Sequence, residues 1–126
     1  MSKAWCAGAA ILILAHVAWH AAVQAGGYSG VLVSLLWLSP FVAGLVTSCF
    51  APRRKIILGM STAILSAVLV VAFNAAYQLL GHSVDFPGLS GGLILFSTTF
   101  VYAGAISAAG SVVGYLLTRK RKGKAG

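Results

Sequence analysis

The sequence predicts an all-α polytopic membrane protein whose four transmembrane helices form an antiparallel bundle with both termini in the cytoplasm. Of its 126 residues, 60% are hydrophobic and 8% are charged, whereas a soluble domain carries about 25% charged residues. The charged residues occur in short clusters, and the apolar runs between them accommodate helices of about 20 residues, the length that a bilayer requires. A water-soluble globule of this composition would lack polar surface.

Four spans fit these apolar runs, and together they make one integral membrane domain. Their predicted ranges are residues 4–25, 31–51, 56–80 and 93–117, followed by a basic tail over residues 118–126 that we expect to be mobile. Glycine-rich turns follow the first and third spans, as is typical of helix ends. Pro40 lies inside the second span, so we expect a kink there, with the freed carbonyl satisfied by a neighbour or by a local distortion of the helix.

The basic residues predict the orientation. With four spans, all nine Lys and Arg residues fall on one side of the membrane, and the positive-inside rule makes this the cytoplasmic side. The turns that follow the first and third spans then face outward, and their compactness favours a bacterial inner membrane. We expect seven of these basic residues to set the topology and to contact anionic lipid headgroups, rather than to bind nucleic acid. They are Arg53, Arg54, Lys55, Arg119, Lys120, Arg121 and Lys122.

An alternative interpretation concerns the first span, which has features of a cleavable signal peptide. Lys3, an apolar core and small residues before Gly26 fit that pattern. His16 and His20 interrupt the apolar core, which argues against cleavage. Cleavage after residue 25 would leave three spans in an unchanged orientation.

Polar side chains inside the spans are costly in hydrocarbon and tend to face the interior of a bundle. On the first and third spans they recur at intervals of four residues, so each set follows one helix face. At a rise of 1.5 Å per residue the two sets reach similar depths, level with hydroxyl residues on the other two spans. The predicted polar layer, in the outer half of the membrane, consists of His16, His20, Gln24, Asn74, Gln78, His82, Asp85 and Thr98.

Two interpretations of this layer remain open. It is a site for an ion, a small cationic solute or a relayed proton, or it is interhelical hydrogen bonding, at about 0.6 kcal/mol for each bond. Asp85, the only acidic residue, is correspondingly a contact for an incoming cation or a solvated turn residue. Histidines four residues apart can share a metal ion, but no extended metal motif is present, so we predict no metal and no cofactor.

The inner half of the last span is rich in small residues spaced by four, and the second span offers a matching face. Such faces let helix backbones approach closely. The predicted packing residues are Gly44, Ser48, Ala103, Ser107, Gly110, Ser111 and Gly114. They serve either packing within the bundle or association with another chain.

Catalysis finds no support in the sequence. A single carboxylate side chain excludes a two-carboxylate mechanism within one chain. No nucleophile elbow, phosphate-binding loop or dinucleotide fingerprint occurs. We therefore expect no enzymatic activity.

In length and span number the chain resembles the small multidrug transporters, although it lacks the membrane-embedded glutamate of their first helix. The run from Gly91 to Phe100 is similar to a stretch of the small fluoride channels that is rich in glycine, phenylalanine, serine and threonine. The arginine-bearing first-helix motif and the second-helix asparagine of that family are absent here. No functional residue is carried over from either family.

The expected function is therefore that of a small membrane protein that works through helix association. It would act as a homo-oligomer or as an accessory subunit of a larger membrane complex. The alternative is a small transporter or channel for an ion or a small cationic solute, with its site in the polar layer. The expected partners are the bilayer and either a second copy of the chain or another membrane protein.

Overall fold

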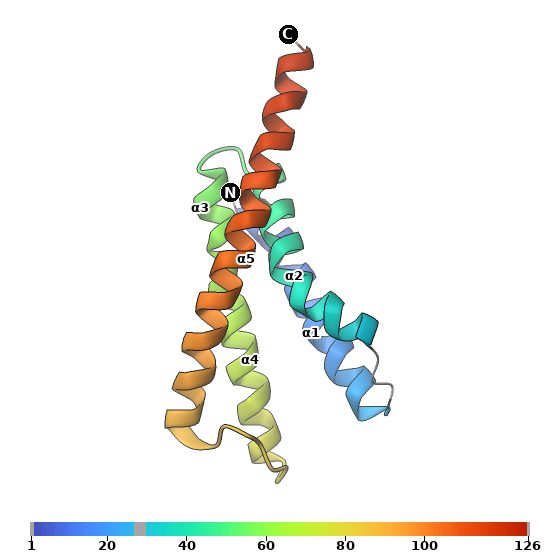
Figure 1. Ribbon diagram of the computed structural model, residues 1–126, viewed down its shortest axis with the longest axis vertical. Helices are drawn as coiled ribbons and strands as arrows, with labels where there is room; N and C mark the ends of the chain where they lie inside the picture. The colour runs from blue at the N-terminus through green and yellow to red at the C-terminus, as the bar shows by residue number, and fades with distance from the viewer. Residues whose placement is uncertain (1, 27–29, 126) are drawn as a thin grey trace.

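The computed structural model describes residues 2–26 and 30–125, and this part of the chain is all-helical (Figure 1). The helices are α1 (Ser2–Gln24), α2 (Gly30–Phe50), α3 (Lys55–Met60), α4 (Thr62–Leu79) and α5 (Gly88–Ala125). Helices α3 and α4 follow each other directly and form one span over Lys55–Leu79. The described residues thus contain four helices long and apolar enough to cross a membrane, which confirms the predicted all-α class and the expected number of such helices.

The last helix is longer than predicted at both ends. It begins at Gly88, where the backbone φ is +74°, rather than near residue 93, and the side chain of Gln78 accepts a hydrogen bond from the Gly88 N–H at 3.1 Å. That bond satisfies one of the amide groups that a helix start leaves unpaired. The basic tail, expected to be mobile, instead continues α5 to Ala125. Lys and Arg are good helix formers and no proline interrupts them, so the helix has no local reason to end at Thr118.

The third span contains an irregular turn at Ser61 that separates α3 from α4. Two hydroxyls bond back to the preceding turn: Ser61 Oγ donates to the Leu58 carbonyl at 2.6 Å, and Thr62 Oγ1 donates to the Gly59 carbonyl at 2.7 Å. Such bonds compete with the backbone ladder and bend helices. The sequence contains this pair of hydroxyls, but we had not predicted the break.

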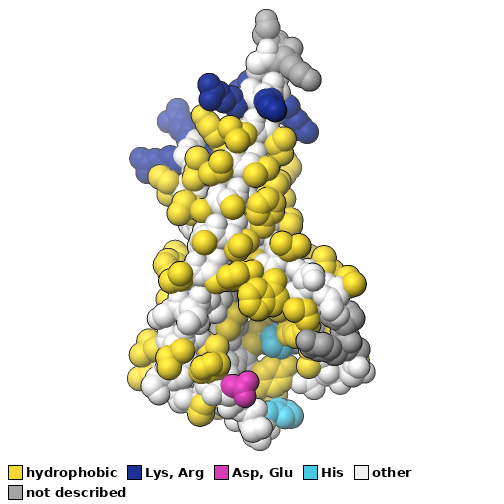
Figure 2. All heavy atoms as spheres, in the orientation of Figure 1, with side chains coloured by type: hydrophobic (Ala, Val, Ile, Leu, Met, Phe, Trp, Pro, Cys, Tyr) yellow, Lys and Arg dark blue, Asp and Glu magenta, His cyan; other side chains and the backbone are white. Residues whose placement is uncertain are grey.

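The chain ends and the α2–α3 turn lie toward one end of the molecule, and the α4–α5 loop lies at the other (Figure 1). We call these the basic end and the far end, because the described Lys and Arg side chains gather at the first of them (Figure 2). In the half toward the basic end, the helices lie close together. In the far half, the α1–α2 hairpin diverges from the α4–α5 hairpin (Figure 1).

The core of the basic half is built from small residues on α2, α3 and α5. A Cβ atom added at Gly44 would overlap the backbone of Ser107, and one added at Gly59 would overlap the Ser111 side chain. Ser48 Oγ also donates to the Ser111 carbonyl at 2.8 Å. The predicted small-residue faces therefore meet within a single chain, and helix backbones approach as closely there as glycine permits.

Pro40 marks the place on α2 where the two halves of the molecule separate. Its ring nitrogen cannot donate to the carbonyl of Leu36, and the Ser39 hydroxyl takes over this carbonyl at 2.6 Å. One residue further on, the Tyr102 hydroxyl of α5 donates to the Trp37 carbonyl at 3.1 Å. The freed carbonyl is therefore satisfied within α2 by Ser39, while the neighbouring helix α5 bonds the carbonyl of Trp37.

The charged turn between α2 and α3 is shaped by its own basic residues. Arg54 adopts a left-handed conformation with φ 49°, which reverses the chain. Lys55 does not extend freely into the surroundings: its Nζ donates to the carbonyls of Ser48 and Ala51 at 3.2 and 2.6 Å. A cation at the C-terminal end of α2 also interacts favourably with the helix dipole. Lys55 thus caps a helix, whereas we had predicted a headgroup contact.

Candidate functional site

A cleft separates the two hairpins in the far half of the molecule. It consists of two adjoining cavities that share His16, Leu36 and Val70 in their walls. The deep cavity lies toward the basic half and has a volume of about 350 Å³. The mouth cavity includes the loop between α4 and α5 and has a volume of about 650 Å³. Figure 2 shows the hollow, with the acidic side chain and the imidazoles around it.

One wall of the cleft is a column of aromatic and imidazole rings contributed by α1 and α4. His20 stacks on Phe73, with ring centroids 4.0 Å apart, and its Nδ1 lies 2.8 Å from the Tyr77 hydroxyl. Gln24 Nε2 donates to the same hydroxyl at 3.2 Å. The hydroxyl has one hydrogen, so when it accepts from Gln24 it can donate to His20 Nδ1. The His20 ring then carries its own hydrogen on Nε2.

The loop at the mouth is held in place by α4. Asn74 Nδ2 donates to the Phe86 carbonyl at 3.0 Å, and the His82 ring meets Tyr77 edge-on with centroids 5.8 Å apart. Asp85, between these contacts, is exposed and lines the mouth cavity. Among the described residues, Lys and Arg lie at the opposite end of the molecule (Figure 2). The Asp85 carboxyl group therefore lies at the entrance without a Lys or Arg side chain beside it.

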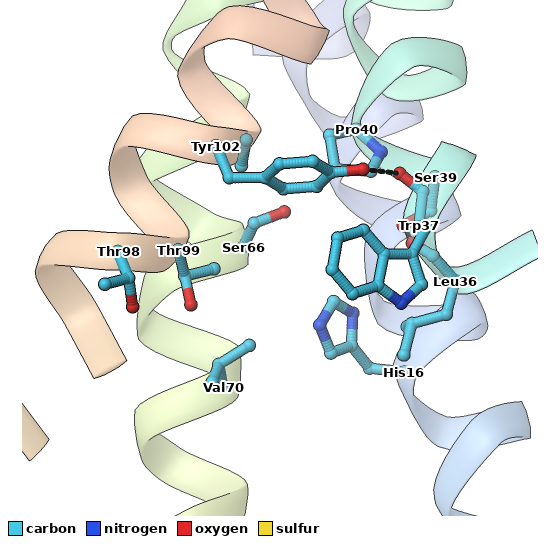
Figure 3. Close-up of a pocket in the computed structure, with 11 residues that line it drawn as sticks. His16, Leu36, Trp37, Ser39, Pro40, Ser66, Val70, Thr98, Thr99 and Tyr102 are labelled. Carbon is cyan, nitrogen blue, oxygen red and sulfur yellow. Dashed lines mark hydrogen bonds between the residues drawn. The ribbon is translucent and has the colours of Figure 1, made fainter. Parts of the chain in front are cut away.

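The deep cavity receives side chains from all four spans. His16 enters from α1, Trp37 from α2, Ser66 from α4 and Thr99 from α5, as Figure 3 shows. Tyr102 crosses above them to α2, and the other lining residues are mostly apolar. The arrangement offers hydrogen-bonding groups and apolar surface but no fixed charge. It can hold an uncharged group or water.

The structure brings most of the predicted polar layer together at the cleft. The predicted residues that line one or both of its cavities are His16, His20, Asn74, His82, Asp85 and Thr98. Gln24 does not line either cavity, but its side chain donates a hydrogen bond to the hydroxyl of Tyr77, which does. Gln78 faces the groove between α4 and α5 instead, together with Leu79 and Leu89.

The hydroxyl residues that were expected to complete the layer bond within their own helices. Ser34 Oγ donates to the Gly30 carbonyl at 2.9 Å, is exposed and lines neither cavity. Thr98 Oγ1 donates to the Ile94 carbonyl at 2.8 Å. The neighbouring Thr99 contributes its hydroxyl to the deep cavity instead (Figure 3).

Sequence reasoning missed several residues that line the cleft. Trp37, Ser66, Phe73 and Tyr102 line the cleft but do not belong to the predicted polar layer. Pro40 was the available signal, because a kink directs the residues before it away from the neighbouring helix. The depth at which the hairpins separate depends on packing in the other half of the molecule, and no local pattern encodes it.

No group of three or more potential metal-binding side chains comes together in the described part of the chain. Cys6 and Cys49 are both free thiols. Asp85, the single carboxylate side chain, forms no ion pair with a Lys or Arg among the described residues.

Comparison of the chain with protein-family models, with curated proteins and with solved structures finds no match in any of the three.

Proposed function

We propose that the four helices cross a membrane in alternating directions, with the basic end in the cytoplasm, as in a bacterial inner membrane. The support is the collection of the described Lys and Arg residues at one end of the molecule (Figure 2), because basic residues accumulate in cytoplasmic loops. The cleft then opens to the outside. Basic side chains on the extended end of α5 contact anionic lipid headgroups, at about 1 kcal/mol for each one near the surface.

We propose further that the chain is a small transporter or channel that takes up a small cationic solute from the outside. The observation that carries this proposal is the mouth cavity of about 650 Å³, with the only acidic residue at its rim and the basic residues at the other end of the molecule. An isolated carboxylate at the entrance raises the local concentration of cations. No catalytic step is part of the proposal.

In this proposal the described conformation is the outward-open one. The basic half is closed by contacts that leave no room for a Cβ atom at Gly44, Gly59 or Gly110. Passage of a solute toward the cytoplasm requires these contacts to separate. The rigid hairpins provide two bodies that can rock about them, as in many secondary transporters.

The test is flux into proteoliposomes of purified protein, with tetramethylammonium and methylammonium as probe cations. We expect Asp85→Asn to reduce uptake severalfold and Asp85→Glu to preserve most of it, because the charge is what attracts the cation. His20→Ala and Asn74→Ala alter the cleft wall and should also reduce uptake. Ser97→Ala is the control, since Ser97 bonds to its own helix and lines neither cavity.

Uptake that equals the rate in protein-free liposomes for both cations would overturn the proposal. So would uptake that is the same in the wild type and in the Asp85, His20 and Asn74 variants. Thermal unfolding of every variant in the same detergent separates loss of uptake from loss of fold.

A second candidate function is association with another membrane protein or with a second copy of the chain. The cleft between the hairpins in the far half favours it, because side chains of a partner helix could enter the two cavities there. The small residues of α2 and α5 no longer support it, since they are buried against each other within one chain. Native mass spectrometry from mild detergent should then show a stable complex, and a strict monomer that retains uptake would exclude this candidate.

A further inference from the structure

Each span contributes at least one hydrogen-bonding side chain to the deep cavity, and four of these side chains, one from each span, carry the argument. These side chains are His16, Trp37, Ser66 and Thr99. They face a common space of about 350 Å³ beside Tyr102 (Figure 3). Ligand sites usually combine a mostly apolar cavity with a few polar groups in this way, at volumes of about 300–1,000 Å³.

Ser66 provides the most informative observation. The residue is 2% exposed, and its Oγ has no hydrogen-bond partner among the described residues. In Figure 3 the hydroxyl is directed across the cavity, away from its own helix. A buried polar group without a partner costs about 1–3 kcal/mol. A group supplied from the cavity would remove this cost.

His16 is held with one nitrogen available to the cavity. Its Nδ1 lies 2.8 Å from the Leu12 carbonyl, and a carbonyl can only accept, so Nδ1 carries the hydrogen. In the neutral ring Nε2 is then an acceptor. The bond to Leu12 fixes the ring, which lies beside Trp37 at the lower edge of the cavity (Figure 3).

Thr99 and Trp37 add two further groups with free capacity. Ser97 and Thr98, next to Thr99, both donate to carbonyls of their own helix at 2.8 Å, but the Thr99 hydroxyl has no such bond among the described residues. The carbonyl of Trp37 accepts from Tyr102, and its indole N–H remains without a described partner. The cavity therefore offers donors and acceptors together.

The rest of the wall determines what can bind there. Leu36, Pro40, Val70 and Ala103 are apolar, and the cavity contains no carboxylate, Lys or Arg. A charged group would lose its hydration without gaining a counter-ion, which is costly. An uncharged group that both donates and accepts, on an apolar or aromatic body, satisfies Ser66, Thr99 and His16 together.

We infer that the deep cavity is a subsite for the uncharged, hydroxyl-bearing apolar end of an amphiphilic amine whose protonated amine lies at the mouth beside Asp85. Along α4, Ser66 and Asn74 are eight residues apart, so the two ends of the ligand are separated by about 12 Å. The amine end rests on the proposed function. The proposal of a deep subsite depends only on the side chains that line the deep cavity, and it is tested without a cation.

The experiment uses Trp37 as the reporter. In the full chain with Trp5→Phe and Trp19→Phe, reconstituted in nanodiscs, Trp37 fluorescence is titrated with 4-bromophenol, whose bromine quenches at short range. We expect saturable quenching. Bromobenzene, which lacks the hydroxyl, should bind about three- to tenfold more weakly, as should 4-bromophenol to Ser66→Ala or Thr99→Val, since each loses one hydrogen bond.

Two further variants make the result decisive. Ser97→Ala removes a hydroxyl that bonds only to its own helix, so it should leave the 4-bromophenol affinity unchanged. Val70→Phe fills space in both cavities and should abolish the saturable component. Quenching that rises linearly with probe concentration, as for partition into lipid, would overturn the inference, and so would equal affinities in the wild type, Ser66→Ala and Thr99→Val.

The transporter proposal and the deep-subsite proposal can each be rejected while the other is supported. Saturable phenol binding without any cation uptake that depends on Asp85 would support the deep subsite and reject the transporter. Cation uptake that depends on Asp85, with only linear phenol quenching, would support the transporter and reject the subsite.

Discussion

The basic half and the far half of the molecule contain the same four spans but are packed in opposite ways. In the basic half, small residues of α2, α3 and α5 bring backbones into contact, and hydroxyls such as that of Ser48 bond across helices. In the far half, larger side chains and a proline hold the hairpins apart. Because lipid tails are as apolar as leucine, membrane helices associate through close packing rather than hydrophobic burial. The difference in residue size therefore decides which half closes.

The largest effect on this contrast should come from enlarging a glycine in the closed half. Gly44→Ala places a Cβ atom against the Ser107 backbone, which cannot rotate away. We expect a loss of about 1–3 kcal/mol in the free energy of unfolding, as for other overpacked sites, measured by titration with SDS in mixed micelles. Gly104→Ala is the matched control on α5, because a Cβ atom there meets no other atom within 4 Å.

For Gly104→Ala we expect a small gain of about 0.5–1 kcal/mol, since alanine is the better helix former. Equal destabilisation by the two substitutions would show that the helices do not touch at Gly44, and the comparison between the halves would lose its basis.

A smaller effect is expected from removing a hydroxyl that joins two helices. Ser48→Ala deletes the 2.8 Å bond from Ser48 to the Ser111 carbonyl in a fully buried position. The free energy of unfolding should fall by about 0.5–1.5 kcal/mol. Ser34→Ala in the far half removes a hydroxyl that is exposed and bonded to its own helix, and it should change stability by less than about 0.5 kcal/mol. A reversed order of the two values would contradict the account.

The smallest measurable effect concerns the boundary between the halves. Tyr102→Phe removes the bond to the Trp37 carbonyl beside Pro40, and we expect a loss of about 0.6 kcal/mol, the average for such bonds in membranes. Spin-label distances between Leu38→Cys on α2 and Ile94→Cys on α5 should also become broader. Tyr115→Phe, on the same helix, removes a hydroxyl that makes no hydrogen bond to another described residue, and it should change neither quantity.

Much of the fold was predictable because membrane spans are set by length and composition. The four apolar runs and the position of Pro40 follow from the sequence, and the residues predicted to pack, such as Gly44 and Ser107, meet in the structure. The extension of α5 through the basic tail was missed because clustered charge was interpreted as a mobile segment, although Lys and Arg favour helix.

The sequence predicted which residues line the outer part of the candidate site better than it predicted how deep the cleft extends. Spacing by four identified His16, His20 and Asn74, and these line the cleft. Ser66 was not placed there, because matching depths along straight helices ignores the angle between the hairpins. That angle depends on the close glycine contacts in the other half of the molecule as well as on Pro40 and the larger side chains at the cleft.

The central claim is that the cleft is open at the far end of the molecule and that the basic half is closed. Accessibility should therefore change along the single helix α5. Thr99 and Ser107 lie eight residues apart on α5, one at the deep cavity and the other fully buried. In a Cys6→Ala, Cys49→Ala background, an uncharged, membrane-impermeant methanethiosulfonate that carries a sugar, added outside, should modify Thr99→Cys at least about tenfold faster than Ser107→Cys, since thiol reactivity follows access. Equal rates, or an unreactive Thr99→Cys in a folded protein, would contradict the claim.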